Sequence, residues 1–297
     1  MIHKSVLLKE TMEFLQPKPG GIYLDLTFGG GGHSKEILKL SNPDGIVVAF
    51  DQDAQAIIEA SKLKETYEDR LKIIKENFSK CYNRLLDMGF IAFDGIIMDV
   101  GVSSFQLDDA QRGFSFLKDG PLDMRMDKNN PLSAKIIVNQ WGRYELENII
   151  RSFGQERFAK KIALKIEEKR NKASIETTLE LATIIKEATP AYFYKKIHPA
   201  TKTFQALRIV VNSELDNLKE GLIGAIKLLK VNARLVVISF HSLEDKIVKD
   251  TFRNFSQQKI VSILTKKPII PSVNETLKNP RARSAKLRSI EKIGGSI

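Results

Sequence analysis

Cysteine and long apolar runs are the two features this sequence has least of. Cys81 is the only cysteine, which excludes a disulfide framework and any zinc or iron–sulfur site held by several thiolates. No apolar run reaches the roughly 18 residues that a membrane-spanning helix needs. Glu10 and Glu13 stand where a secretory signal would be apolar. We therefore expect a cytoplasmic protein of a reducing compartment, without a membrane span.

Acidic residues are also fewer than basic ones. The 297 residues include 47 Lys and Arg against 36 Asp and Glu, which gives a net charge of +11 and a sequence pI near 9.5. This balance is typical of proteins that bind nucleic acid, although a solvated surface can produce it too. With 42% hydrophobic residues and no internal repeat, the chain can bury a sizeable core.

The first hundred residues alternate short apolar runs with amphipathic stretches. The runs at 22–26, 46–50, 71–74 and 95–100 predict buried parallel strands, because they are nearly continuous rather than alternating. Helical patterns lie between them, at 33–40, 54–64 and 79–88. Such alternation predicts an α/β fold with a parallel sheet.

The pattern changes after about residue 108 and later returns. Helical patterns fill 134–188 without a convincing strand. The alternation then resumes with one or two helices over 204–229, a strand over 233–240 and a helix over 243–252. We therefore predict an α/β domain over 1–108 and 207–297, interrupted by an all-α domain over 109–206. Residues 151–203 carry twelve Lys and Arg against six Glu. The segment 278–292 has six basic residues and one acid, and its Pro280 suggests an extended, partly mobile tail.

A glycine-rich loop, Asp25-Leu-Thr-Phe-Gly-Gly-Gly-Gly-His-Ser, follows the first predicted strand and opens a helix. Glycines let the backbone approach a ligand closely, and a helix N-terminus directs N–H groups at it. Asp51 ends the second strand, where an acid can accept hydrogen bonds from a ribose diol. Asp51 could instead cap the next helix, a role that Asp53 could also take.

These features indicate a nucleoside cofactor and leave two classes open. A dinucleotide site prefers G-x-G-x-x-G, whereas here Asp25 lies four residues before the first glycine. An acid so near the loop repels a pyrophosphate and could help to hold a cationic methionine group, which favours S-adenosylmethionine over a nicotinamide. Asp99 ends the fourth strand and should face the reactive end of the cofactor. Phe78, after the third strand, lies against adenine or in the core.

The sequence resembles the MraW, or RsmH, family of bacterial 16S rRNA (cytosine-N4)-methyltransferases over almost its whole length. The resemblance is carried by long motifs in the order of that family. They include Thr27-Phe-Gly-Gly-Gly-Gly-His-Ser, Asp99-Val-Gly-Val-Ser-Ser-Phe-Gln-Leu-Asp, Gly120-Pro-Leu-Asp-Met-Arg-Met-Asp, His198-Pro-Ala-Thr-Lys-Thr-Phe-Gln, Ile238-Ser-Phe-His-Ser-Leu-Glu-Asp and Asn279-Pro-Arg-Ala-Arg-Ser-Ala-Lys-Leu-Arg.

The resemblance implies a class I methyltransferase fold, Rossmann-like, with an inserted helical domain that recognises the substrate. It implies methyl transfer from S-adenosyl-L-methionine to N4 of one cytidine in the decoding region of 16S rRNA, with the small ribosomal subunit as partner. The cofactor residues it implies are Gly31, Gly32, His33, Asp51, Phe78, Asp99 and Gln106. This sequence differs from the residues common in the family at Val100, Lys202 and Asn232-Ala233. None of these positions belongs to the implied cofactor set.

Several residues keep two interpretations. Asp99 is the first candidate catalytic residue; His241 is the second, and it is equally well explained as a loop histidine bonded to Glu244 or Asp245. Asp123 and Asp127 flank Arg125 and fit an ion-pair network or a catalytic role. A base platform could come from one of the aromatic residues Phe105, Phe114, Phe116 or Phe240, although each also fits the core. We expect no metal, because the chemistry needs none.

RNA contacts are predicted for basic residues of the insert and the tail, since these suit phosphates. They are Lys160, Lys161, Lys195, Lys196, Lys202, Arg281, Arg283, Lys286 and Arg288. The rivals are a methyltransferase for another RNA, DNA or a protein amine, a nicotinamide oxidoreductase, and a non-catalytic ribosome-assembly factor. The sequence leaves monomer and homodimer equally open.

Overall fold

A computed structural model describes residues 5–190, 192 and 197–294. The chain forms two compact units. Unit 1 comprises Met1–Gly101 and Leu215–Ile297, and unit 2 comprises Val102–Glu214. The boundaries predicted at residues 108 and 206 both fall inside unit 2. None of the described helices is long and apolar enough to cross a membrane.

Unit 1 is built on a sheet that has seven strands among the described residues, in the order β3-β2-β1-β4-β5-β7-β6. The strands are β1 (Ile22–Asp25), β2 (Ile46–Asp51), β3 (Leu71–Lys75), β4 (Phe93–Asp99), β5 (Leu229–Ser239), β6 (Val261–Ile263) and β7 (Lys286–Lys292). β1 to β5 are parallel, and β7 runs antiparallel between β5 and β6. The first four predicted strands are therefore confirmed, and the fifth begins at Leu229 rather than at residue 233.

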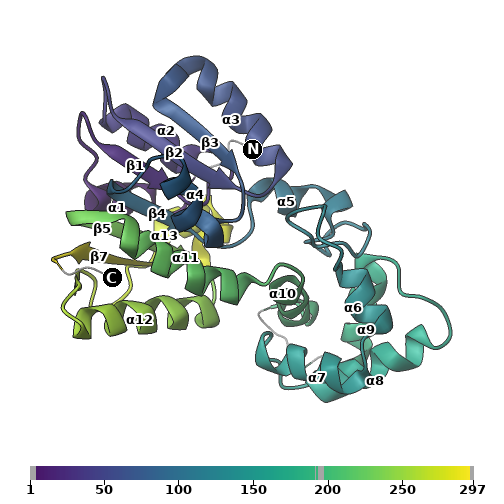
Figure 1. Cartoon of the computed structure of the whole chain (residues 1–297). Coiled ribbons are helices and arrows are strands. Elements are labelled where there is room, and N and C mark those ends of the chain that lie inside the picture. Colours follow the sequence, from purple (N-terminus) through teal and green to yellow (C-terminus); the bar gives the residue numbers. More distant parts are fainter. Residues whose placement is uncertain (1–4, 191, 193–196, 295–297) are drawn as a thin grey trace. The chain divides into compact units, whose positions relative to one another are not determined.

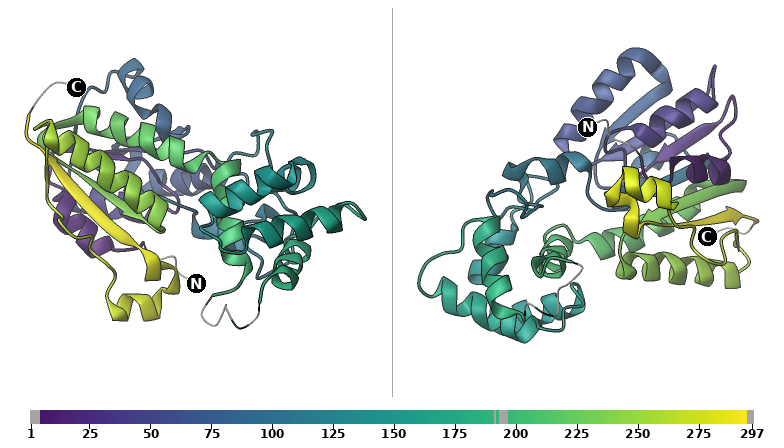
Figure 2. Two further views of the ribbon diagram at one scale, coloured as in Figure 1. Left: turned by 90° about the horizontal axis from the view of Figure 1, so that it is seen from below. Right: turned by 180° about the vertical axis from the view of Figure 1, so that it is seen from behind.

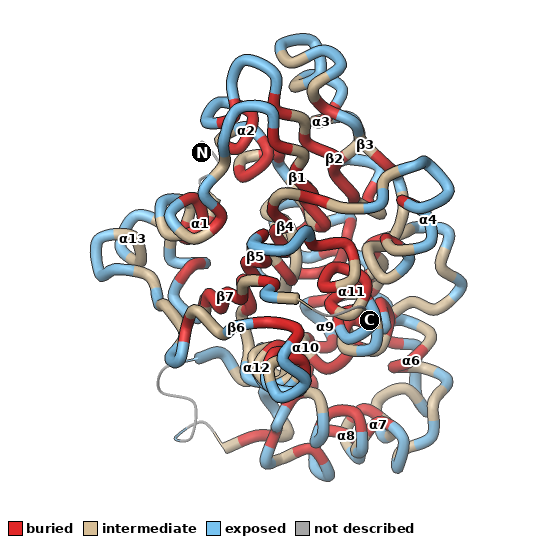
Figure 3. The backbone as a smooth tube through the Cα atoms, turned by 60° about the vertical axis from the view of Figure 1, so that its left-hand side comes forward, coloured by how far each residue is buried: buried red, intermediate tan, exposed pale blue. Residues whose placement is uncertain are grey.

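Helices cover both faces of this sheet (Figure 1). One face packs against α1 (Leu8–Leu15), α2 (Gly32–Leu40) and α3 (Ala54–Tyr67), and the other against α4 (Cys81–Asp87), α11 (Glu214–Leu228) and α12 (Ser242–Gln257). Because both faces are covered, β1, β2 and β4 are buried along most of their length (Figure 3). The carboxyl ends of these strands therefore lie at one edge of a sheet that is buried on both faces in apolar side chains.

The C-terminal segment is ordered, and the prediction of an extended, mobile tail is wrong for the described residues. α13 (Val273–Lys278) and a 3₁₀ helix (Pro280–Ser284) lead into β7, which lies within the sheet beside β5 (Figure 2). The basic side chains concealed a strand whose Leu287 and Ile290 are fully buried. The high density of basic residues did not indicate an exposed tail, because Lys286 and Arg288 form ion pairs with Asp245 of α12.

Unit 2 is all-helical apart from an isolated bridge between Pro121 and Thr177 in its described part. It contains α5 (Ser104–Asp108), α6 (Ala134–Gln140), α7 (Arg143–Ser152), α8 (Ala159–Arg170), α9 (Thr178–Ala188) and α10 (Ala200–Val211). A separate core of aliphatic side chains holds these helices together, with Leu146, Ile162 and Leu181 fully buried. The predicted helical insert is therefore present.

Candidate functional site

The glycine loop joins β1 to α2 at the carboxyl edge of the unit 1 sheet. Gly31 is the N-cap of α2 and has a φ of 72°, a left-handed conformation that favours glycine. A Cβ on Gly31 would lie 2.6 Å from the Phe28 ring, and one on Gly32 would lie 2.0 Å from Ser5 Oγ. Glycine is therefore required at both positions, because the neighbouring side chains Phe28 and Ser5 leave no room for a Cβ.

Asp25, the last residue of β1, holds the glycine loop through side-chain hydrogen bonds. Its carboxylate accepts hydrogen bonds from Ser34 Oγ at 2.6 Å and from the Thr27 amide at 3.0 Å. The side chain is buried, and burial raises its pKa to about 6, although both hydrogen bonds oppose the rise. The suggestion that Asp25 holds a methionine group is replaced by an internal role, because both oxygens are used inside the loop.

Asp51 lies beside the loop at the end of β2. It accepts hydrogen bonds from the amides of Gly29, at 2.8 Å, and Asp53, at 2.9 Å. Burial raises its pKa to about 6. Asp53 is the residue that caps α3, by accepting from Gln55 N. The helix-capping interpretation of Asp51 is therefore wrong, and its carboxylate borders the glycine backbone.

Asp99 ends β4, the strand next to β1. Its amide donates to Thr27 Oγ1 at 2.6 Å, which ties the end of β4 to the glycine loop. Its Oδ2 lies 3.7 Å from His33 Nδ1. Its Oδ1 is buried and accepts no hydrogen bond from any described residue. Burial first, and then the charges of Asp25 and Glu244, raise the pKa of Asp99 well above its usual range.

That unpaired oxygen is the chief chemical feature of the site. A buried carboxylate oxygen without a donor costs free energy unless a proton, a ligand or a cation satisfies it. Thr27 is a site residue that sequence analysis missed. A hydroxyl two positions after Asp25 gave no signal, because its partner is 72 positions away in the chain.

Phe78 begins a short 3₁₀ helix after β3 and is partly buried against the core. Its ring packs on Gly221 of α11, where an added Cβ would come within 2.5 Å of it. Gln106 belongs to unit 2, where it forms a capping box with Ser103 at the start of α5. The structure thus gathers the unit 1 cofactor candidates Gly31, Gly32, His33, Asp51 and Asp99 along one edge of the sheet.

His241 caps the N-terminus of α12. Its Nδ1 accepts from Glu244 N at 3.4 Å, while Glu244 Oε2 accepts from the amides of Phe240, at 2.7 Å, and His241, at 3.2 Å. His241 is therefore bonded to Glu244, as the second interpretation of this residue in the sequence predicts. A catalytic role for His241 stays a prediction.

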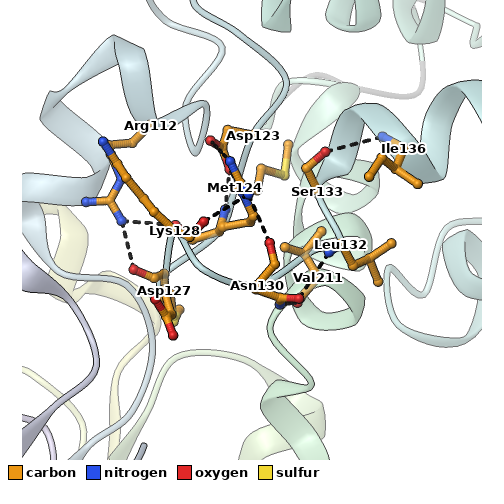
Figure 4. Close-up of polar contacts among 12 residues, drawn as sticks. Arg112, Asp123, Met124, Asp127, Lys128, Asn130, Leu132, Ser133, Ile136 and Val211 are labelled. Carbon is orange, nitrogen blue, oxygen red and sulfur yellow. Dashed lines mark hydrogen bonds and ion pairs between the residues drawn. The ribbon is translucent and has the colours of Figure 1, made fainter. Parts of the chain in front are cut away.

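The motif loop at 112–133 is braced within unit 2 (Figure 4). Arg112 Nη2 donates to the carbonyls of Arg125 and Met126, at 3.0 and 3.1 Å. Arg125 pairs with both oxygens of Asp123, at 2.7 and 3.0 Å. The ion-pair interpretation of Asp123 is therefore confirmed. Phe114 and Phe116 belong to the helical core, where Phe116 stacks on His198.

The residues predicted to contact RNA fall into three groups. Lys160, Lys161, Arg281 and Arg283 are exposed, whereas Lys202 donates to the Gln155 carbonyl at 2.9 Å. Arg288 is buried and pairs with Asp245 at 2.6 Å, and Lys286 shares that acid at 3.3 Å. The structure therefore engages Lys286 and Arg288 internally. Lys195 and Lys196 lie outside the described residues.

Known proteins are similar to this chain over nearly its whole length. The sequence profile of the MraW methylase family matches residues 1–293. Proteins named ribosomal RNA small subunit methyltransferase H are similar to this chain. Those of Geotalea daltonii and Carboxydothermus hydrogenoformans are each 47% identical, over 98% of this chain and 98% of theirs. The crystal structure of an rRNA methylase from Streptococcus thermophilus aligns with a TM-score of 0.48 at 11% identity, covering 99% of each chain.

The sheet with its antiparallel β7, the helices on both faces and the glycine loop define a class I S-adenosylmethionine-dependent methyltransferase. The chain belongs to the MraW methylase family. Its cofactor is S-adenosylmethionine. The residues present fit that cofactor, because Asp99 Oδ1 offers a cationic group an acceptor that no described residue occupies, and the Asp99 amide ties it to the glycine loop through Thr27.

Replacing Gly31 with alanine should abolish measurable cofactor binding. The substitution forces a left-handed alanine, which costs about 1–2 kcal/mol, and drives its Cβ into the Phe28 ring. Isothermal titration with S-adenosylmethionine checks this, with Gly89→Ala as the matched control. Gly89 also has a positive φ, 81°, but an added Cβ there meets nothing within 4 Å. Equal affinities in the two variants would contradict the prediction.

Proposed function

We propose that this protein transfers a methyl group from S-adenosylmethionine to the exocyclic N4 of a cytidine in the decoding region of small-subunit rRNA. The observation that carries the proposal is the buried, unpaired oxygen of Asp99, which the Thr27 hydrogen bond fixes next to the glycine loop. The relatives named ribosomal RNA small subunit methyltransferase H supply the substrate class. An rRNA substrate would place the reaction in the bacterial cytoplasm.

Residues of unit 1 would hold the cofactor. The backbone of Gly31 and Gly32 would lie against its methionine end, and Asp51 would accept hydrogen bonds from the ribose diol. Phe78 would lie against the adenine, and His33 completes the unit 1 set. The cofactor contact of Gln106, which belongs to unit 2, stays a prediction from the family resemblance. When bound, S-adenosylmethionine supplies an electrophilic methyl group on a sulfonium centre.

The chain must then prepare a weak nucleophile. The lone pair of cytosine N4 is delocalised into the ring, so the amine has to be oriented and one N–H has to be accepted by a neighbour. Asp99 Oδ1 suits that task because it is an acceptor whose position is fixed by β4 and by Thr27. Holding the amine in line with the methyl donor can supply much of the rate.

The target cytidine lies in folded RNA and would have to leave its stack to reach Asp99. The exposed cations Lys160 and Lys161 of α8, with Arg281 and Arg283 after α13, are suited to phosphate contacts. Lys286 and Arg288 are weaker candidates, because their charges are already paired with Asp245. The helical unit would act in recognition of the substrate.

A methyl-transfer assay tests the proposal directly. The protein is mixed with methyl-labelled S-adenosylmethionine and small ribosomal subunits that lack this modification, and the labelled nucleoside is identified by mass spectrometry. We expect N4-methylated cytidine in the small-subunit rRNA. Label in another nucleoside, in transfer RNA or in protein would contradict the proposed target while keeping the methyltransferase.

A further inference from the structure

Three aromatic rings of unit 2 form a stack that reaches its surface. Phe204 of α10 is buried in the helical core. The ring of Phe116 meets it edge-on, with centroids 4.9 Å apart and planes inclined by 77°. The ring of His198 lies nearly flat on Phe116, at 4.6 Å and 28°. Phe116 is partly buried and His198 is exposed, so the stack ends in an imidazole ring at the surface.

The start of α10 also holds this imidazole ring. His198 Nδ1 accepts a hydrogen bond from the Ala200 amide at 3.2 Å, and the His198 carbonyl accepts one from the Thr201 amide at 3.1 Å. The stacked phenyl ring and the first turn of the helix together fix the orientation of an exposed side chain. A side chain that is fixed in advance loses little conformational freedom when it binds a ligand.

The His198 ring is uncharged in this arrangement. A ring nitrogen that accepts a hydrogen bond carries no hydrogen, so the hydrogen of the neutral imidazole is on Nε2. Burial of the ring, and then the charge of Lys186, lower the pKa of His198 from its ordinary value, which also favours the neutral form. An uncharged ring is no partner for a phosphate. His198 instead offers a ligand the flat face of an aromatic ring.

The surface around this ring is apolar and basic. Leu117 is 86% exposed and Ile197 is 37% exposed, and each is adjacent in the chain to one of the two stacked rings. Lys186 of α9 is near enough to act on His198 electrostatically, and Lys118 follows Leu117 in the chain; both lysines are exposed. RNA-binding proteins combine aromatic rings, on which unstacked bases lie, with cations for the phosphates. Both features are present here.

We propose that the exposed face of the His198 ring is a stacking platform for one unpaired base of the RNA substrate, with Phe116 as its support. The inference rests on the proposed function, because the RNA substrate supplies the base. Lys186 and Lys118 are suited to the phosphates beside that base. Because every base has an aromatic face, the platform distinguishes single-stranded from paired RNA rather than one base from another.

Fluorescence anisotropy tests the platform with the whole protein. The probes are a fluorescein-labelled single-stranded RNA of mixed adenosine and cytidine, and the duplex that it forms with its complement. His198→Ala should weaken binding of the single strand about fivefold to a hundredfold, the range of base–aromatic stacking. Binding of the duplex should not change, because its bases are already stacked on one another. His198→Phe keeps an aromatic ring and should stay within about threefold of wild type.

The dependence on salt separates stacking from charge. The logarithm of the affinity falls linearly with the logarithm of the salt concentration, with a slope that follows the number of phosphates contacted. His198→Ala should leave this slope unchanged, whereas Lys186→Ala should reduce it by about one. A smaller slope for His198→Ala would mean that this histidine contacts a phosphate, and would overturn the stacking role.

Ile91→Ala is the matched control for the loss of exposed apolar surface. Ile91 is 76% exposed and precedes β4, at the amino edge of the unit 1 sheet. Its replacement should leave the affinity for both probes unchanged. The unfolding transition seen by Trp141 fluorescence should be the same in wild type and in the His198 variants, which shows that unit 2 remains folded.

The remaining outcomes separate this inference from the proposed reaction. Equal single-strand affinities of wild type and His198→Ala, or a loss that His198→Phe does not restore, would overturn the platform even if the methyl-transfer assay yields N4-methylated cytidine. A loss that His198→Phe restores, together with no methylated cytidine in that assay, would contradict the proposed reaction and leave the platform established.

Discussion

Replacing Asp99 with alanine is expected to lower methyl transfer at least about a hundredfold while leaving unit 1 folded. The side chain accepts no hydrogen bond at Oδ1 from the described residues, so its removal breaks no internal bond there. The backbone bond from the Asp99 amide to Thr27 survives the substitution. The loss should therefore appear in the rate of methyl transfer and in cofactor affinity, measured by single-turnover kinetics and calorimetry.

Asp87→Ala is the matched control, because Asp87 is an exposed acid at the end of α4. It should keep the wild-type rate. An Asp99→Ala enzyme within a few-fold of wild type would show that Asp99 neither orients the amine nor holds the cofactor. His241, the second candidate, would then be the residue to replace.

The second large effect concerns stability and its dependence on pH. Asp25 has a pKa of about 6 in the folded protein against 3.8 for a solvated aspartate, so the native state binds more protons than the unfolded chain between these limits. The contribution of Asp25 to stability is therefore highest at low pH and is lost as the pH rises through about 4 to 6. A shift of roughly two pH units corresponds to about 3 kcal/mol.

Asp25→Asn should remove that loss. An asparagine can accept from the Thr27 amide through its oxygen and donate to Ser34 Oγ through its nitrogen, which keeps both bonds of the loop. The free energy of unfolding of the variant, relative to wild type, should rise by up to about 3 kcal/mol from pH 4 to pH 7. Hydrogen exchange of the β1 and β2 amides measures unit 1 specifically.

Unit 2 provides an internal reference for this measurement. Trp141 is the only tryptophan and lies in unit 2, so its fluorescence follows the unfolding of that unit. We expect the same Trp141 transition in wild type and Asp25→Asn. A stability difference that does not change with pH would show that Asp25 is ionised in the folded loop throughout this range.

The sheet and the glycine loop were predictable because their signals are local. Continuous apolar runs predicted β1 to β4, and the glycines before a helix predicted the loop. The assignments that failed depend on partners distant in the chain. Arg288 was interpreted as free for RNA because its partner, Asp245, is 43 positions earlier. The bond between Thr27 and Asp99 was missed for the same reason.

The division of the chain also has a consequence for synthesis on the ribosome. Unit 1 is made of two separate stretches, with all of Val102–Glu214 between them. β1 to β4 therefore leave the ribosome first, and β4 keeps an unpaired edge until Leu229–Ser239 has been made and can join it as β5. The helical unit is one continuous stretch with its own core, so it is the first part of the nascent chain that can be completed.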